Sequence, residues 1–219
     1  MSLLIAVIEH ELQALHIAAD NRATNIDGTH SDDNANKVFQ IRPGIFYGIS
    51  GITDECMRLK EALDANNDLT ASELIALATD FEIENLEYQG ETHGASFILA
   101  GVHEDGEPFI WSRSTYPEDH TEDSNVKVDG FLGVDPGSLV KGSGALKVSA
   151  PNCTTAEYTQ SNFIERYKTA VGNYGQAIAL SIVHASEMDH TISPSMDLFS
   201  IDLKTGKIHS GHYNLARTA

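Results

Sequence analysis

Cysteine is scarce in this chain of 219 residues, and its scarcity limits the kinds of fold that the sequence can adopt. Of the two cysteines, Cys56 falls in a predicted helix and Cys153 just before another. Two cysteines cannot form the set of cross-links on which small secreted domains depend. We therefore expect a fold held together by its hydrophobic core, in a reducing and hence cytoplasmic location.

Long apolar runs and basic residues are also in short supply. No apolar run approaches the roughly 18 residues that a membrane-spanning helix needs, and the opening MSLLIAVIEHE lacks the basic residues of a signal peptide. Only 14 Lys and Arg stand against 32 Asp and Glu, which gives a net charge of −18. Such a charge repels nucleic acid and anionic membranes, so we expect neither as a partner.

The remaining pattern is that of one domain, residues 1–219, with strands and helix pairs in alternation. Short apolar or alternating runs predict strands at 2–8, 12–19, 38–41, 45–49, 95–102, 108–112, 145–150, 196–202 and 207–210. Helical spacing of apolar residues predicts helices at 53–66, 70–87, 154–171 and 174–188. Two helix pairs placed between runs of strands favour an α+β fold in which two sheets pack face to face with helices outside.

The starts of two predicted helices have the sequence of a capping box, whereas residues 114–144 give little indication of secondary structure. Thr70 and Glu73, and likewise Thr154 and Glu157, have the spacing of a capping box. Residues 25–36 and 114–144 are rich in turn-forming residues, so we expect a loop in the first and make no assignment in most of the second.

Charged residues stand at the ends of predicted strands, where the neighbouring apolar residues indicate burial. Asp20 and Arg22 follow one apolar strand, and Lys37 opens the next one. A buried charge needs a partner, so Asp20 and Lys37 are expected to pair. From the residues alone, this pair could be either a structural ion pair or part of a catalytic site.

The sequence around these charges resembles the N-terminal half of a proteasome β-type subunit. The resemblance rests on AADNRAT, NKVFQI and YGISG in residues 18–51, on residues 88–113, and more weakly on MDHTISPSMDL in residues 188–198. It implies the four-layer αββα sandwich of the N-terminal nucleophile (Ntn) hydrolases. It also implies a cytoplasmic protease that cleaves peptide bonds in peptides or unfolded proteins and forms a homo-oligomer, most simply a ring.

The resemblance assigns site residues one by one. Asp20, Arg22 and Lys37 match the aspartate, arginine and lysine of the family's site, Gly51 matches the turn glycine whose N–H faces the carbonyl oxygen, and Asp189 matches an aspartate at the end of the fourth helix. In the family, a lysine held by an aspartate lowers the pKa of the terminal amine and stabilises the oxyanion. The α-amine has a reference pKa of about 8, so it can act as base for the adjacent hydroxyl.

The nucleophile depends on how the first hairpin is aligned. Counting back from Asp20 without a gap places the family's first residue on Leu4, which has no chemistry. Two extra residues in the turn at 9–11 place it on Ser2, and a side-chain period of two leaves the strand pattern the same in both alignments. Ser2 is therefore the candidate nucleophile, provided that Met1 is removed to free its amine.

Two supporting positions depart from the family pattern. The serine of the family's turn before the third helix falls near Asn152, and the serine after the fourth helix falls on Ile192, with Ser193 one place later. We therefore take Asn152 and Ser193 as the supporting candidates beside Arg22.

Other functions remain open at this point. The same fold could serve as a catalytically inactive subunit with a structural or binding role, or as an amidase for a small non-peptide substrate. The pair His209 and His212 has no third residue at a suggestive spacing, so we expect no metal site and no cofactor.

Overall fold

The computed structural model describes residues 3–11, 13–27, 29–115, 127–128, 131–150, 153–169 and 174–215. The expected α+β class is confirmed: within these residues there are two large sheets, two small hairpin sheets and four helices. No helix among the described residues is both long and apolar enough to cross a membrane.

The first large sheet has seven strands in the order β11-β12-β14-β1-β2-β15-β16. Its described pairs are antiparallel except for β12 and β14, which run parallel. Its strands are β1 (Leu4–Ile8), β2 (Ala14–Asp20), β11 (Lys127–Val128), β12 (Phe131–Gly133), β14 (Ala145–Ser149), β15 (Ser195–Asp202) and β16 (Ile208–Asn214).

The second large sheet has five strands in the antiparallel order β13-β10-β9-β6-β5. Its strands are β5 (Val38–Arg42), β6 (Ile45–Gly51), β9 (Ala95–Val102), β10 (Pro108–Ser114) and β13 (Leu139–Lys141). The two small sheets pair β3 (Ala23–Thr24) with β4 (His30–Asp32) and β7 (Leu86–Tyr88) with β8 (Glu91–His93).

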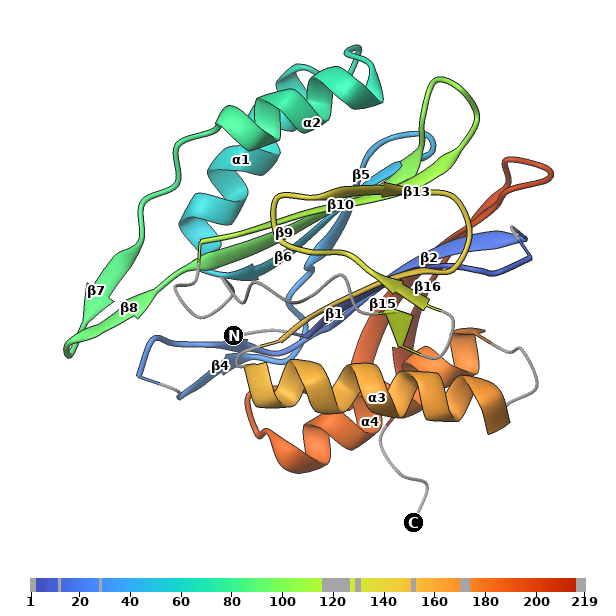
Figure 1. Ribbon diagram of the computed structural model, residues 1–219. Coiled ribbons are helices and arrows are strands. Elements are labelled where there is room, and N and C mark those ends of the chain that lie inside the picture. The colour runs from blue at the N-terminus through green and yellow to red at the C-terminus, as the bar shows by residue number, and fades with distance from the viewer. Residues whose placement is uncertain are drawn as a thin grey trace.

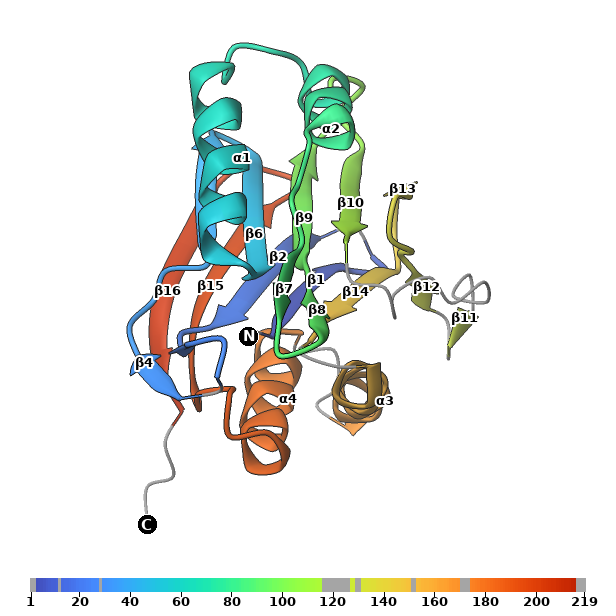
Figure 2. The ribbon, with the colours of Figure 1, turned by 90° about the vertical axis from the view of Figure 1, so that its left-hand side faces the viewer.

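Each large sheet carries one pair of helices, as Figures 1 and 2 show. The helices are α1 (Thr53–Ala65), α2 (Ala71–Asp80), α3 (Cys153–Thr169) and α4 (Tyr174–Met188). Buried side chains from α1 and α2 form one apolar cluster with the five-stranded sheet, and those of α3 and α4 form another with the seven-stranded sheet.

A third apolar cluster lies between the two sheets, and strand β1 contributes side chains both to it and to the cluster under α3 and α4. Its alternate residues Leu4, Ala6 and Ile8 belong to the cluster between the sheets. Ile5 and Val7 belong to the cluster under α3 and α4. Because side chains alternate along a strand, a run that is apolar at every position can bury both of its faces.

The predicted second helix is too long, and its end has a cause elsewhere in the chain. It ends at Asp80, although the apolar spacing predicts that it continues to residue 87. The Arg113 guanidinium of β10 donates to the carbonyl oxygens of Ala78 (2.8 Å) and Phe81 (2.7 Å), which satisfies groups that a longer helix would use itself. The β7–β8 hairpin occupies the residues that follow.

Helix starts and the first loop agree with the predictions only in part. The capping box at Thr70 and Glu73 is present, as predicted. The third helix, α3, begins at Cys153, one residue before the predicted start; the side chain of Thr154 lies outside the described part, so the second box stays a prediction. α1 has Ile52 at its N-cap without a side-chain cap, and strand β4 lies within the segment predicted as a loop.

Candidate active site

Asp20 is the last residue of β2, and its carboxylate is fully buried with four hydrogen-bond donors around it. Oδ1 accepts from the Leu3 N–H (2.8 Å) and from Lys37 Nζ (3.0 Å). Oδ2 accepts from the N–H groups of Arg22 (2.9 Å) and Ser193 (3.1 Å). Two donors on each oxygen compensate the carboxylate for its loss of water.

Lys37 precedes β5 and completes the predicted ion pair with Asp20, which the 3.0 Å contact confirms. Its Nζ also donates to the carbonyl oxygen of Arg22. The side chain is only 5% exposed, and this burial lowers the pKa of the ammonium, while the charge and hydrogen bond of Asp20 act in the opposite direction. Its third N–H has no acceptor among the described residues, so it is available to a further group.

Arg22 contributes to this arrangement chiefly through its backbone, since its N–H binds Asp20 and its carbonyl binds Lys37. Its guanidinium binds Asp33 Oδ1 (2.7 Å) and the carbonyl of His190 (2.6 Å). The side chain thereby ties the segment after β2 to the loop before β5 and to the turn after α4. Arg22 is thus a positioning residue.

The turn after α4 brings Ser193 to Asp20 but leaves Asp189 at a different place. Asp189 Oδ1 accepts from the N–H (2.9 Å) and hydroxyl (2.6 Å) of Thr191, which shapes the turn. Ser193 reaches Asp20 with its N–H, and its hydroxyl accepts from the Asn21 N–H at 3.1 Å. No described contact joins Asp189 to Asp20 or Lys37; its described side-chain bonds lie within this turn.

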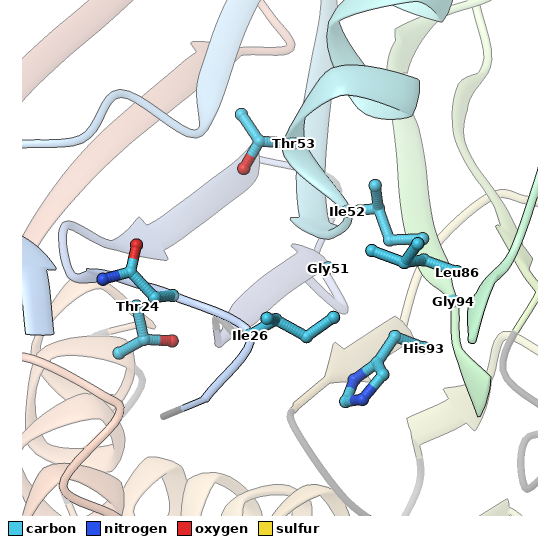
Figure 3. Close-up of a pocket in the computed structure, with 9 residues that line it drawn as sticks. Thr24, Ile26, Gly51, Ile52, Thr53, Leu86, His93 and Gly94 are labelled. Atoms are coloured by element: carbon cyan, nitrogen blue, oxygen red, sulfur yellow. The ribbon is translucent and has the colours of Figure 1, made fainter. Parts of the chain in front are cut away.

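Gly51 ends β6 with φ +98°, a left-handed conformation that favours glycine. It borders two pockets that also share Thr24 and Thr53. The smaller, the lysine pocket, has about 70 Å³ and is lined by Ala23, Thr24, Ala35, Asn36, Lys37, Ile49, Ser50, Gly51 and Thr53. The larger, the hairpin pocket, has about 190 Å³ and is lined by Thr24, Asn25, Ile26, Gly51, Ile52, Thr53, Leu86, His93 and Gly94 (Figure 3).

The described chain begins one residue after the candidate nucleophile. Ser2 and Asn152 both lie outside the described residues, so their predicted roles stay predictions. Leu3 pairs with Asp20 at the start of β1, because its N–H reaches the carboxylate and its carbonyl accepts from the Asp20 N–H (3.1 Å). Leu4, the other alignment candidate, is fully buried in the cluster between the sheets.

A chain of polar contacts beside Asp20 was missed in the sequence. Asn21 Nδ2 donates to Asp197 Oδ2 (2.7 Å), and Asp197 Oδ1 lies 2.9 Å from His212 Nδ1. Asp197 is close enough for its charge to raise the pKa of Lys37. Asp197 alternates with apolar residues on β15, and this pattern could have marked it as a polar residue with a partner. The sequence could not show which partners it has, because they are 15 and 176 residues away.

The histidine pair considered in the sequence does not gather into a metal site. His209 and His212 are three residues apart on β16, so they lie on opposite faces of the strand. Among the described residues, no group of three His, Cys, Asp or Glu side chains could hold a metal ion.

Asp20, Lys37 and Gly51 all lie in the first half of the chain, and Ser193 contacts Asp20 from the second half. The first half is where a match to known proteins is found: the proteasome subunit family matches residues 13–116. In this segment the chain is similar to proteasome subunits. The resemblance inferred from residues 18–51 and 88–113 is thereby confirmed, and the match spans Asp20, Arg22, Lys37 and Gly51. No curated protein matches the chain significantly.

Proposed function

We propose that this chain is an Ntn hydrolase of the proteasome type that cleaves peptide bonds, with its 219 residues forming one four-layer αββα domain. The observation that carries the proposal is the Asp20–Lys37 pair. A purely structural pair would have its donors satisfied within the fold. Lys37 instead keeps one N–H without a protein acceptor among the described residues and lines a pocket bordered by Gly51.

Ser2 is the proposed nucleophile, and its neighbour Leu3 supports the assignment. The Leu3 amide nitrogen, which is bonded to the Ser2 carbonyl carbon, donates to the same Asp20 oxygen as Lys37. Leu4 cannot take this role, because it is an aliphatic side chain within the core. The assignment requires removal of Met1, since only a free α-amine can accept the hydroxyl proton.

The proposed reaction follows from these groups. The Ser2 amine takes the hydroxyl proton as Oγ attacks the peptide carbonyl, and the Gly51 N–H and the Lys37 ammonium face the oxyanion that forms. The amine then passes the proton to the nitrogen of the departing peptide. The remaining acyl group forms an ester with Ser2, and water hydrolyses that ester. In this proposal, Asp20 orients Lys37, and Arg22, Asp189, Asn152 and Ser193 support the site.

The second candidate is an inactive subunit, and two contacts favour it. The hydroxyl of Ser193 is occupied by Asn21 and by the hydroxyl of Ser195 (2.9 Å), and Asp189 is occupied by Thr191. Side chains committed in this way are not placed to assist a terminal amine. An amidase for a small substrate would use the same groups as the peptidase and differ only in what the pockets accept.

We also propose a cytoplasmic homo-oligomer, which the family match supports. The apolar spacing of the helices predicted at 70–87 and 174–188 offered faces for assembly, but the apolar faces of α2 and α4 are largely buried within the chain. On the side of α3 and α4, Tyr158 and Met188 are the exposed large apolar side chains among those that the structure describes, at 39% and 51% exposure. Light scattering at micromolar concentration should give a mass well above one chain.

Hydrolysis of a panel of fluorogenic peptides and small amides tests the proposed activity. Ser2→Ala should abolish turnover, and Lys37→Ala should lower it by about 100- to 1,000-fold, as for loss of one oxyanion-stabilising group. Lys141→Ala is the matched control, because Lys141 pairs with Asp105 on the surface, at 2.7 Å, away from both pockets. Turnover that survives Ser2→Ala would exclude Ser2 as the nucleophile, and absence of turnover in the wild type with Met1 removed would favour the inactive subunit.

A further inference from the structure

The β7–β8 hairpin follows α2 where the sequence predicted more helix, and its turn and strand pairing place two of its side chains at a pocket. Its two-residue loop, Gln89 and Gly90, has φ values of +53° and +85°, as tight hairpin turns with two left-handed residues require. Leu86 and His93 are directly paired across β7 and β8, so their side chains project to the same face. That face lines the hairpin pocket.

The base of the hairpin is fixed to the body of the protein, although its strands extend beyond α1 and the sheets (Figure 1). The Glu84 N–H donates to Glu55 Oε2 of α1 at 3.2 Å. Asn85 Nδ2 donates to the carbonyl of Thr115, just after β10, at 3.0 Å. Contacts to both sides immediately before β7 hold Leu86 at the pocket.

Three large aliphatic side chains line this pocket beside uncharged polar groups, and the described lining holds no Asp, Glu, Lys or Arg. Leu86 lies beside Ile52, and Ile26 lies across from His93 (Figure 3). Ile26 and Leu86 are 38% and 48% exposed, so two of the few large apolar side chains left exposed in the described residues border one cavity. His93 is the only titratable side chain in the lining, and the others are aliphatic, hydroxyl, amide or glycine.

We propose that the β7–β8 hairpin determines specificity by forming one wall of a pocket for a bulky apolar side chain of a peptide substrate. The inference rests on the proposed function, because the pocket shares Thr24, Gly51 and Thr53 with the lysine pocket and is therefore continuous with the candidate site. A volume of about 190 Å³ suits one large side chain. A charged side chain would lose water there without gaining an ionic partner.

The test uses blocked fluorogenic peptides that are identical except for one residue on either side of the cleavage point, which is Phe, Leu, Ala, Asp or Lys. Wild-type protein should favour Phe over Ala by about 10- to 100-fold in kcat/KM, the discrimination that an apolar pocket achieves. Leu86→Lys should remove most of that preference and raise the relative rate of the Asp peptide. Leu139→Lys is the matched control, since Leu139 is 42% exposed on β13 and lines neither pocket.

Binding of the same peptides, measured by fluorescence anisotropy, separates this inference from the proposed activity. Selective binding of the Phe peptide without cleavage by any variant would contradict the hydrolase and support the pocket. Cleavage at equal rates across the panel, or a Leu86→Lys variant with unchanged preference, would support the hydrolase and overturn the pocket. If Leu86→Lys changes the oligomeric mass and not the peptide preference, a second copy of the chain covers the hairpin and the inference is wrong. A panel that is neither bound nor cleaved would overturn both.

Discussion

Replacing Asp20 by Asn should destabilise the fold more than replacing Lys37 by Met, although each change breaks the same ion pair. The reason lies in what each partner keeps. Without Lys37, the Asp20 carboxylate still accepts from the N–H groups of Leu3, Arg22 and Ser193. Without the Asp20 charge, the Lys37 ammonium keeps only neutral acceptors among the described residues, the carbonyl of Arg22 and at best the new amide oxygen.

The magnitudes follow from this count of partners. A buried charge that loses its partner costs about 3–5 kcal/mol. The amide nitrogen that Asp20→Asn introduces would in addition face two donors, and a buried donor without an acceptor costs about 1–3 kcal/mol. Asp20→Asn should therefore cost about 4–8 kcal/mol, comparable to the whole stability of many domains. Lys37→Met removes two charge-assisted hydrogen bonds, to Asp20 and to the Arg22 carbonyl, but leaves three N–H donors on the carboxylate, so it should cost about 2–4 kcal/mol.

Urea unfolding at neutral pH, followed by tryptophan fluorescence and circular dichroism, measures the difference. The double variant Asp20→Asn with Lys37→Met should recover part of the loss, because the uncompensated charge is gone, and it remains measurable if the single variant does not fold. Asp33→Asn is the control: it removes the half-exposed partner of Arg22 and should cost less than about 1 kcal/mol. A Lys37→Met variant as unstable as Asp20→Asn would refute the reasoning.

Three further predictions concern single groups. The pKa of Lys37, measured by NMR titration, should lie below the ordinary 10.5 because burial disfavours the ammonium, and Asp20→Asn should lower it further; a value at or above 10.5 would contradict this. In a Cys153→Ser variant, Cys56 should react with a thiol reagent only on unfolding, because burial raises the pKa of its thiol to about 12. The free energy of unfolding should fall as the pH rises above 9.0, since only the thiol of the unfolded chain then ionises. Rapid labelling of the native protein would contradict the burial. Gly51→Ala should cost about 1–3 kcal/mol through its left-handed backbone, and an unchanged urea midpoint would show that the strand end relaxes.

The sequence was a good guide where a pattern is local or a charge has one obvious partner. β9 and α4 have the bounds that their apolar spacing predicts, and the capping box fixes the start of α2. The Asp20–Lys37 pair was predictable because two charges flank apolar strands and each needs the other.

The rest depends on contacts between residues far apart in the chain. The end of α2 is set by Arg113, more than thirty residues later, so helical spacing alone overestimates its length. The N–H of Ser193 reaches Asp20 from across the fold, and a backbone donor leaves no trace in residue type. The hairpin pocket likewise arises from three separate segments, and neither Ile26 nor Leu86 signals it alone.

The central claim is that the Asp20–Lys37 pair serves a nucleophile at Ser2, and trapping the acyl intermediate tests it most directly. Natively expressed protein is mixed with an activated peptide ester, quenched in acid and digested, and mass spectrometry locates the acyl group. Our account predicts an N-terminal peptide that has lost Met1 and carries the acyl group on Ser2, and it predicts that Lys37→Ala greatly reduces this adduct. Retention of Met1, or acylation only at another residue, would contradict it.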